Sequence, residues 1–286
     1  MEYVTLSNGI KIPKLGFGVF QISKEECERC VLDAIEVGYR HIDTAQSYFN
    51  EEEVGNAISK CGVPREELFI TTKVWIDNYG YEKTKKSILK SMEKLKVGYL
   101  DLVLLHQPFS DYYDAYKALQ ELYREKKIKA IGVSNFAPDR LADIVAFNDI
   151  PPQVNQVEVN PLHQQTKAQE NMKKRNVQME AWAPFGEGKN NMFENRLLKE
   201  IAKKYQKSTA QIILRWLMQR DIVALAKSTH IERMKENIEI FDFTLSENDM
   251  RKIAELDTKS SLFFNHQTPE TVDRFVSMIE ERKGKL

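Results

Sequence analysis

Short apolar segments alternate with longer amphipathic segments along most of the chain. The short segments have the length of buried strands, and the longer ones place apolar residues at helical spacing. Strands that alternate with helices are typical of βα units and a parallel sheet. The predicted strands are residues 15–18, 41–43, 69–73, 100–106, 130–134, 153–158, 178–183 and 222–226.

Amphipathic segments follow these strands at regular intervals. The predicted helices are residues 25–37, 51–60, 81–96, 113–126, 138–147, 167–174, 195–219 with a break near 207–209, and 231–238. Eight strands with interleaved helices in a chain of 286 residues predict an α/β fold, a closed (β/α)8 TIM barrel that forms one domain over residues 1–286. An open doubly wound sheet is the alternative, but its usual glycine-rich fingerprint is incomplete at residues 16–21.

The two ends of the chain depart from this alternation. Residues 3–6 and 11–12 flank an Asn-Gly turn at residues 8–9, which is a strong hairpin signal. We therefore expect a small N-terminal β-hairpin that plugs one end of the barrel. Residues 247–256 predict one further helix, and a short C-terminal tail follows it.

Composition excludes several classes of function. Lys plus Arg equals Asp plus Glu, 42 each, so no net charge attracts nucleic acid or an anionic membrane. No apolar run approaches the ~18 residues of a membrane span, and the N-terminus lacks the pattern of a secretion signal. The three cysteines include Cys27 and Cys30, which we interpret as ordinary positions of helix 25–37. These features predict a cytoplasmic protein in a reducing compartment.

Polar or aromatic residues stand at the carboxyl ends of most of the predicted strands. In a (β/α)8 barrel this rim is where the active site lies. The residues in question are Asp43, Lys73, His106, Ser134 with Asn135, Gln156, Trp182, and Lys227 with Ser228. Tyr48 follows in the loop after the second strand.

We expect four of these side chains to act together as one acid–base group. Lys73 ends an apolar strand, so its buried ammonium needs a partner, and Asp43 on the neighbouring strand supplies one. A nearby ammonium lowers the pKa of a phenol, so Tyr48 becomes a tuned acid, and His106 can orient a carbonyl oxygen. A metal site at His41, Asp43 and His106 is the weaker interpretation, because Lys73 would repel a cation.

Three segments resemble the signatures of the aldo-keto reductase family. The first is residues 38–45 followed by Tyr48, the second is residues 129–136, and the third is residues 225–228 followed by Arg233. Their order and spacing match the family over nearly the whole chain. Residues 106–109 and 263–266 most resemble the prokaryotic 2,5-diketo-D-gluconate reductase-like branch.

The resemblance implies a role for each candidate residue. It implies a tetrad of Asp43, Tyr48, Lys73 and His106, in which Tyr48 is the general acid and base. The implied cofactor is NADPH. Its nicotinamide would be held by Ser134, Asn135, Gln156 and Trp182, and its adenosine 2′-phosphate and adenine by Lys227, Ser228, Thr229, Arg233, Glu236 and Asn237. The implied substrate pocket is lined by Phe20, Trp75 and Phe109.

The sequence therefore predicts an NADPH-dependent oxidoreductase that reduces small aldehydes, dicarbonyls or keto-sugars to alcohols. We expect a monomer whose partner is a small-molecule carbonyl compound, with no nucleic acid, membrane or metal involved. The alternative is a regulatory subunit that binds the cofactor with little turnover. A barrel hydrolase or isomerase that uses Asp43 and His106 would leave the cationic Lys227 and Arg233 unexplained.

Overall fold

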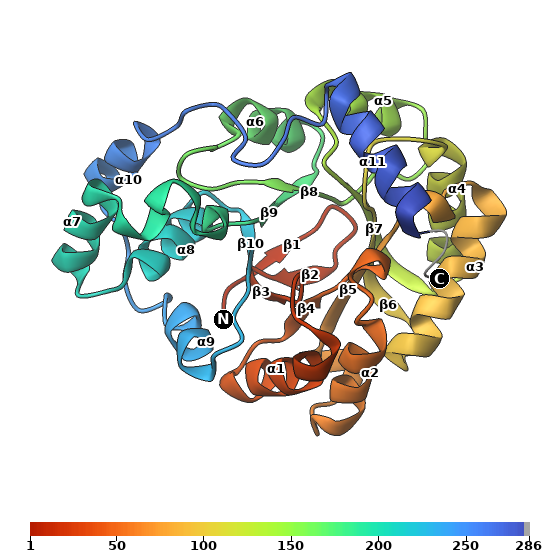
Figure 1. Cartoon of the computed structure of the whole chain (residues 1–286), viewed down its shortest axis with the longest axis horizontal. Coiled ribbons are helices and arrows are strands. Elements are labelled where there is room, and N and C mark those ends of the chain that lie inside the picture. Colours follow the sequence, from red (N-terminus) through yellow and green to blue (C-terminus); the bar gives the residue numbers. More distant parts are fainter. Residues whose placement is uncertain (283–286) are drawn as a thin grey trace.

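Among residues 1–282, which the computed structural model describes, eight parallel strands close into a barrel (Figure 1). In chain order they are β3 (Leu15–Gly18), β4 (His41–Asp43), β5 (Phe69–Val74), β6 (Leu100–Leu105), β7 (Ile128–Ser134), β8 (Val154–Glu158), β9 (Gln178–Trp182) and β10 (Val223–Ala226). Each strand pairs with the next along the chain, and β10 pairs with β3 to close the barrel. The predicted (β/α)8 fold is confirmed.

Helices surround the barrel, and their bounds agree with the predicted ones within two residues. They are α1 (Lys24–Val37), α2 (Glu51–Lys60), α3 (Tyr81–Leu95), α4 (Tyr112–Arg124), α5 (Pro138–Ala146), α6 (Thr166–Lys174), α7 (Arg196–Tyr205), α8 (Thr209–Gln219), α9 (Ile231–Ile238) and α10 (Glu247–Ala254). The predicted break between α7 and α8 is present. There Gln206 is left-handed, and Ser208 and Gln211 form a reciprocal capping box at the start of α8.

The predicted N-terminal hairpin closes one end of the barrel. Its strands are β1 (Tyr3–Thr5) and β2 (Lys11–Pro13), which pair antiparallel. Leu6 and Ile12 of this segment are buried in one apolar cluster with barrel residues such as Phe69 and Leu102. The hairpin thus seals the end of the barrel at which the strands begin, and the opposite end is left for ligands.

Polar side chains from several strands meet inside the barrel above this apolar plug. His41 and Asp43 on β4, Thr71 on β5 and Glu180 on β9 are all fully or almost fully buried. Gly16 on β3 makes room for the ring of His41, because a Cβ atom at this position would lie 2.6 Å from Nδ1 of His41.

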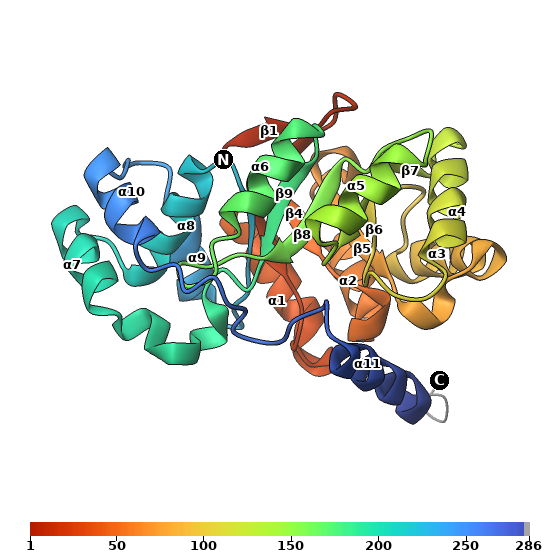
Figure 2. The same cartoon turned by 90° about the horizontal axis from the view of Figure 1, so that it is seen from above.

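The C-terminal segment contains a helix that is not among the predicted ones. This helix, α11 (Pro269–Arg282), lies at the end of the barrel opposite the hairpin (Figure 2). Its Phe275 is only 5% exposed and packs on Trp75 and Phe109, with ring centroids 5.8 and 5.4 Å away. The tail therefore returns to the barrel and covers part of its rim.

The remaining sequence expectations concern cysteines, membranes and metals. Cys27 and Cys30 are buried on α1, and burial raises the pKa of Cys27 to about 12. Over residues 1–282, no helix is long and apolar enough to cross a membrane. In the same part of the chain, no group of three or more His, Cys, Asp or Glu side chains could hold a metal ion.

Candidate active site

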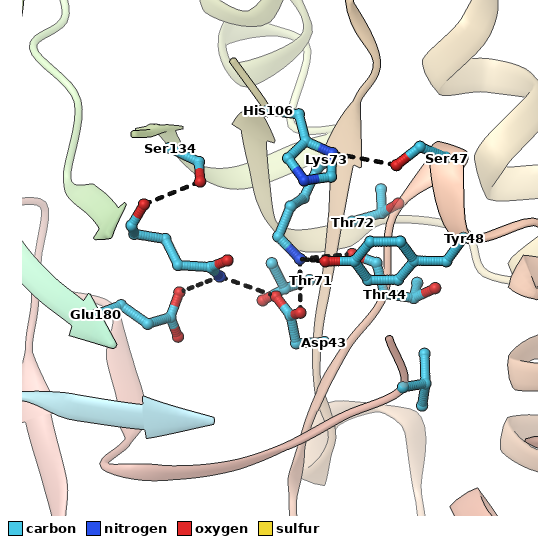
Figure 3. A network of polar contacts seen from close by, with 12 residues as sticks. Asp43, Thr44, Ser47, Tyr48, Thr71, Thr72, Lys73, His106, Ser134 and Glu180 are labelled. Carbon is cyan, nitrogen blue, oxygen red and sulfur yellow. Dashed lines mark hydrogen bonds and ion pairs between the residues drawn. The ribbon is translucent and has the colours of Figure 1, made fainter. Parts of the chain in front are cut away.

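A buried lysine lies at the centre of the rim where the strands end (Figure 3). Nζ of Lys73 donates hydrogen bonds to Oδ1 of Asp43 at 2.5 Å, to the carbonyl oxygen of Thr44 at 3.0 Å and to the hydroxyl of Tyr48 at 3.3 Å. The contact with Asp43 follows from the topology, because β4 and β5 are parallel neighbours that end at the same rim. Lys73 is fully buried, so this ammonium depends on its protein partners for stabilisation.

Tyr48 is held over Lys73 by a short turn after β4. The turn is the 3-10 helix η1 (Gln46–Tyr48), and it ends at the left-handed residue Phe49. Oε1 of Gln46 accepts hydrogen bonds from the backbone N–H of Trp75 at 3.0 Å and from Nδ2 of Asn78 at 2.8 Å. These bonds tie the turn to the loop after β5, so the phenol has a defined position above the lysine.

His106 flanks the phenol from the next strand along the rim. It follows β6, is 9% exposed, and its ring centroid lies 5.7 Å from that of Tyr48. Its Nδ1 lies 3.4 Å from Oγ of Ser47. The sequence predicts that four side chains act together, and the structure brings all four into one cluster. They are Asp43, Tyr48, Lys73 and His106.

The pKa values in this cluster agree with the sequence-based expectation for Lys73 but not for Tyr48. Burial opposes the charge of Lys73, but Asp43 and Tyr48 outweigh it and keep the pKa of the lysine above its usual value. Lys73 itself lowers the pKa of Tyr48, as expected, but the expectation that the net pKa lies below its usual value is wrong. Burial of the hydroxyl raises the pKa of Tyr48 more than the ammonium lowers it. Tyr48 therefore carries its proton at neutral pH.

The residues expected around a nicotinamide lie side by side on β7, β8 and β9. Ser134 donates to the carbonyl oxygen of Gln156 at 2.9 Å, and the indole N–H of Trp182 donates to Oδ1 of Asn135 at 2.9 Å. Asn135 adopts a left-handed conformation, with φ of 66°, and its Nδ2 donates to the carbonyl oxygen of His106 at 3.1 Å. These contacts tie the group directly to the Tyr48 cluster.

The side-chain amide of Gln156 has a fixed orientation. Its Nε2 donates to Oδ2 of Asp43 at 3.0 Å and to Oε2 of Glu180 at 2.9 Å. Its Oε1 accepts no hydrogen bond from any other residue of the described chain. An amide oxygen in this position is suited to accept a hydrogen bond from the carboxamide of a nicotinamide.

Two exposed cations stand where β10 leads into α9. Lys227 and Arg233 form no ion pair or side-chain hydrogen bond within residues 1–282. Between them in the sequence, Oγ of Ser228 accepts a hydrogen bond from the backbone N–H of His230 and donates one to its carbonyl oxygen. These two bonds shape the turn. Unpaired cations beside a hydroxyl and a helix N-terminus fit a phosphate dianion. Of the other predicted residues here, Thr229 and Glu236 are partly buried and Asn237 is buried.

Comparison with known proteins identifies the family. Residues 14–258 match the Aldo/keto reductase family. The chain belongs to the aldo-keto reductase family. A 9,11-endoperoxide prostaglandin H2 reductase of Trypanosoma cruzi is 47% identical over 256 residues, which cover 88% of this chain and 90% of that protein. Glyoxal reductase of Bacillus subtilis is 46% identical over 257 residues, which cover 89% of this chain and 92% of that protein.

A solved structure of the same family gives a similar fold. The aldo-keto reductase of Bombyx mori in complex with NADP is 32% identical and superposes with a TM-score of 0.88, covering 92% of this chain and 95% of that one. These relationships confirm the family resemblance seen in the sequence and make the chain an oxidoreductase of the aldo-keto reductase class. NADP in this relative agrees with the cofactor expected from the sequence.

The predicted pocket residues of this aldo-keto reductase lie on an aromatic wall beside the tetrad. The ring of Phe20, 48% exposed, lies 5.0 Å from that of Tyr48. The ring of Trp75 lies 5.2 Å from that of His106. The ring of Phe275 on α11 packs on both Phe109 and Trp75.

Two features of the site were not predicted from the sequence. Phe275 lies beyond residues 14–258, the part that matches the family. Apolar residues at 272, 275, 276 and 279 have the spacing of an amphipathic helix and could have revealed α11. Glu180 is fully buried on β9 two residues before Trp182. Because alternate residues of a strand face the same side, the parity with Trp182 could have placed Glu180 inside the barrel.

Proposed function

We propose that this aldo-keto reductase uses NADPH to reduce small aldehydes and α-dicarbonyl compounds, with Tyr48 as the proton donor. One observation carries the proposal. The phenol of Tyr48 lies 3.3 Å from a buried ammonium, Lys73, which is itself paired with Asp43 at 2.5 Å. This arrangement supplies a proton and stabilises the phenolate that remains once the proton has left.

The reaction assigns one task to each side chain. A bound carbonyl oxygen accepts a hydrogen bond from the hydroxyl of Tyr48, with the imidazole of His106 beside it. When bound, reduced nicotinamide supplies a hydride to the carbonyl carbon. As negative charge develops on the oxygen, Tyr48 transfers its proton to it, and the alcohol forms. Lys73 stabilises the phenolate electrostatically, and Asp43 keeps the ammonium in place.

The same proposal assigns the cofactor contacts. Ser134, Asn135 and Gln156 would hold the carboxamide of the nicotinamide, and Trp182 would stack on its ring. At the other end, Lys227 and Arg233 would hold the 2′-phosphate together with Ser228 and Thr229, and Glu236 and Asn237 would lie near the adenine. The two exposed cations support a preference for NADPH, because NADH has no 2′-phosphate to neutralise them.

The substrate class is proposed from the walls of the pocket. Phe20, Trp75 and Phe109 provide flat apolar surfaces around one proton donor, which suits compact carbonyl compounds, keto-sugars included. The glyoxal reductase of Bacillus subtilis, 46% identical, supports the choice of α-dicarbonyls. All the proposed residues come from one chain, so a monomer would suffice for activity.

A substrate panel tests this function. The purified protein is mixed with NADPH and with aldehydes, α-dicarbonyls and keto-sugars in turn, and the loss of reduced nicotinamide is followed by absorbance. We expect turnover that is fastest with small aldehydes or dicarbonyls and much slower when NADH replaces NADPH. Tight NADPH binding without turnover of any carbonyl would contradict the proposal and favour a regulatory subunit.

A further inference from the structure

A second carboxyl group lies inside the barrel beneath the proposed site. Glu180 on β9 is fully buried and pairs in register with Gln156 on the neighbouring strand β8. Its Oε2 accepts a hydrogen bond from Nε2 of Gln156 at 2.9 Å. The same Nε2 atom donates to Asp43 at 3.0 Å. Glu180 and Asp43 therefore share one amide group and lie in one buried network.

Glu180 has no cation of its own in this network. Lys73 from β5 is already paired with Asp43 from β4. His41, also from β4, lies 3.7 Å from Oε1 of Glu180, but burial lowers the pKa of this histidine to about 3, so its ring is neutral. On the other side, β10 presents the apolar Val223.

An ionised Glu180 would thus give this buried network a net negative charge. Asp43 and Glu180 would then face the single ammonium of Lys73, with the phenol of Tyr48 uncharged. Burial first, and then repulsion by Asp43, raise the pKa of Glu180 to about 8. The neutral acid therefore predominates at neutral pH, and the carboxyl group loses its proton as the pH rises past about 8.

We propose that Glu180 is a positioning residue that fixes the amide of Gln156 and releases its proton when an oxidised, positively charged nicotinamide ring binds. The inference rests on the proposed function, in which Gln156 holds the nicotinamide. The two carboxyl groups turn Nε2 of Gln156 toward the barrel interior, so Oε1 remains for the carboxamide. A cation above the network favours the anionic form of Glu180, whereas the neutral reduced ring does not.

This coupling has a thermodynamic consequence. By linkage, a ligand that releases a proton binds more tightly as the pH rises. NADP+ should therefore gain affinity relative to NADPH as the pH rises. The 2′-phosphate titrates in both forms of the cofactor, so its contribution cancels in the ratio of the two dissociation constants.

Isothermal titration calorimetry tests the inference with a binding readout. The dissociation constants of NADPH and NADP+ are measured from about pH 6.5 to about pH 9 for the full chain and for Glu180→Gln. We expect the ratio Kd(NADPH)/Kd(NADP+) of the unaltered protein to rise about threefold or more across this range. Glu180→Gln should flatten this rise, because a carboxamide cannot ionise.

Two controls keep the result specific. Glu51→Gln changes another buried carboxyl group, one held by Thr72 at 2.7 Å outside this network, and should keep the rise of the unaltered protein. Titrations of the unaltered protein in two buffers of different ionisation enthalpy count the protons released and do not depend on the folding of any variant. More protons released with NADP+ than with NADPH support the inference.

The outcomes separate this inference from the proposed function. A ratio that is independent of pH in the unaltered protein, or a rise that persists in Glu180→Gln, overturns the role of Glu180 while the reductase function stands. If neither cofactor binds, the proposed function fails and the inference fails with it.

Discussion

The ammonium of Lys73 lies 3.3 Å from the hydroxyl of Tyr48, although the two residues are 25 positions apart in the sequence. The barrel brings them together, because Lys73 belongs to β5 and Tyr48 to the turn that follows the adjacent strand β4. The phenol therefore has a positive charge beside it before any substrate arrives. The proposed proton transfer depends on this proximity.

The buried pair of Lys73 and Asp43 predicts a strong effect on stability. Lys73→Met leaves a buried carboxylate without its cation, and Asp43→Asn leaves a buried ammonium without its anion. Each change should lower the free energy of unfolding by about 3–5 kcal/mol, measured by urea denaturation. The double variant should lose less than the sum of the two, since neither charge is then left alone. Additive losses would contradict the pairing.

The exposed cations beside α9 predict the cofactor preference. Lys227→Ala or Arg233→Ala should raise the KM for NADPH by about 10- to 100-fold, as expected for the loss of a charged hydrogen bond, and leave the KM for NADH nearly unchanged. Lys235→Ala is the matched control, because Lys235 is an exposed lysine of the same helix that pairs with Glu232 at 3.2 Å. An equal rise of both KM values would argue against a 2′-phosphate site.

The aromatic contact of α11 predicts an effect on substrate binding. Phe275→Ala removes the ring that joins Trp75 to Phe109, so the KM for an aromatic aldehyde should rise about threefold to tenfold. Val276→Ala serves as the control, because Val276 is 48% exposed on the same helix. The affinity for NADPH should be the same in both variants. Indistinguishable KM values for the two variants would remove α11 from the pocket.

The buried titratable groups predict how stability depends on pH. The pKa of Glu180 is raised from 4.5 to about 8 on folding, so the stability that its proton contributes is complete below pH 4.5 and is lost as the pH rises to about 8. The pKa of His41 is lowered from 6.5 to about 3, so its contribution has the opposite sign and is lost below pH 6.5. Of these two groups, only Glu180 therefore changes the free energy of unfolding between pH 6.5 and 8.

Unfolding titrations check this window. The unaltered protein should lose stability between pH 6.5 and about 8, and Glu180→Gln should lose less over the same range. Parallel curves for the two proteins would show that Glu180 is already ionised in the folded state at neutral pH.

Much of the fold is readable from the sequence, because its periodic patterns are local. The alternation of apolar and amphipathic segments gave the strand order and the helix ends, and the Asn8-Gly9 turn gave the hairpin that carries Leu6 into the barrel. The same order placed Asp43 and Lys73 on neighbouring strands, so their contact could be predicted.

Properties that depend on burial and on distant packing were not readable. The pKa of Tyr48 depends on how far its hydroxyl is desolvated, and this burial outweighs the effect of Lys73. The position of Phe275 depends on the path of the tail back over the rim, which no local pattern encodes. Glu180 is an acidic residue within a strand, and only the closed barrel shows that it shares the amide of Gln156 with Asp43.

The most direct test of the proton-donor role is the variant Tyr48→Phe, which removes one hydroxyl and keeps the ring. Reduction of a small aldehyde with NADPH should fall at least about a hundredfold, as expected for the loss of a general acid. The dissociation constant of NADPH, measured by calorimetry on the same sample, should change by less than about twofold, because no proposed cofactor contact involves this hydroxyl. Turnover close to that of the unaltered protein, with the cofactor bound, would contradict the assignment of Tyr48.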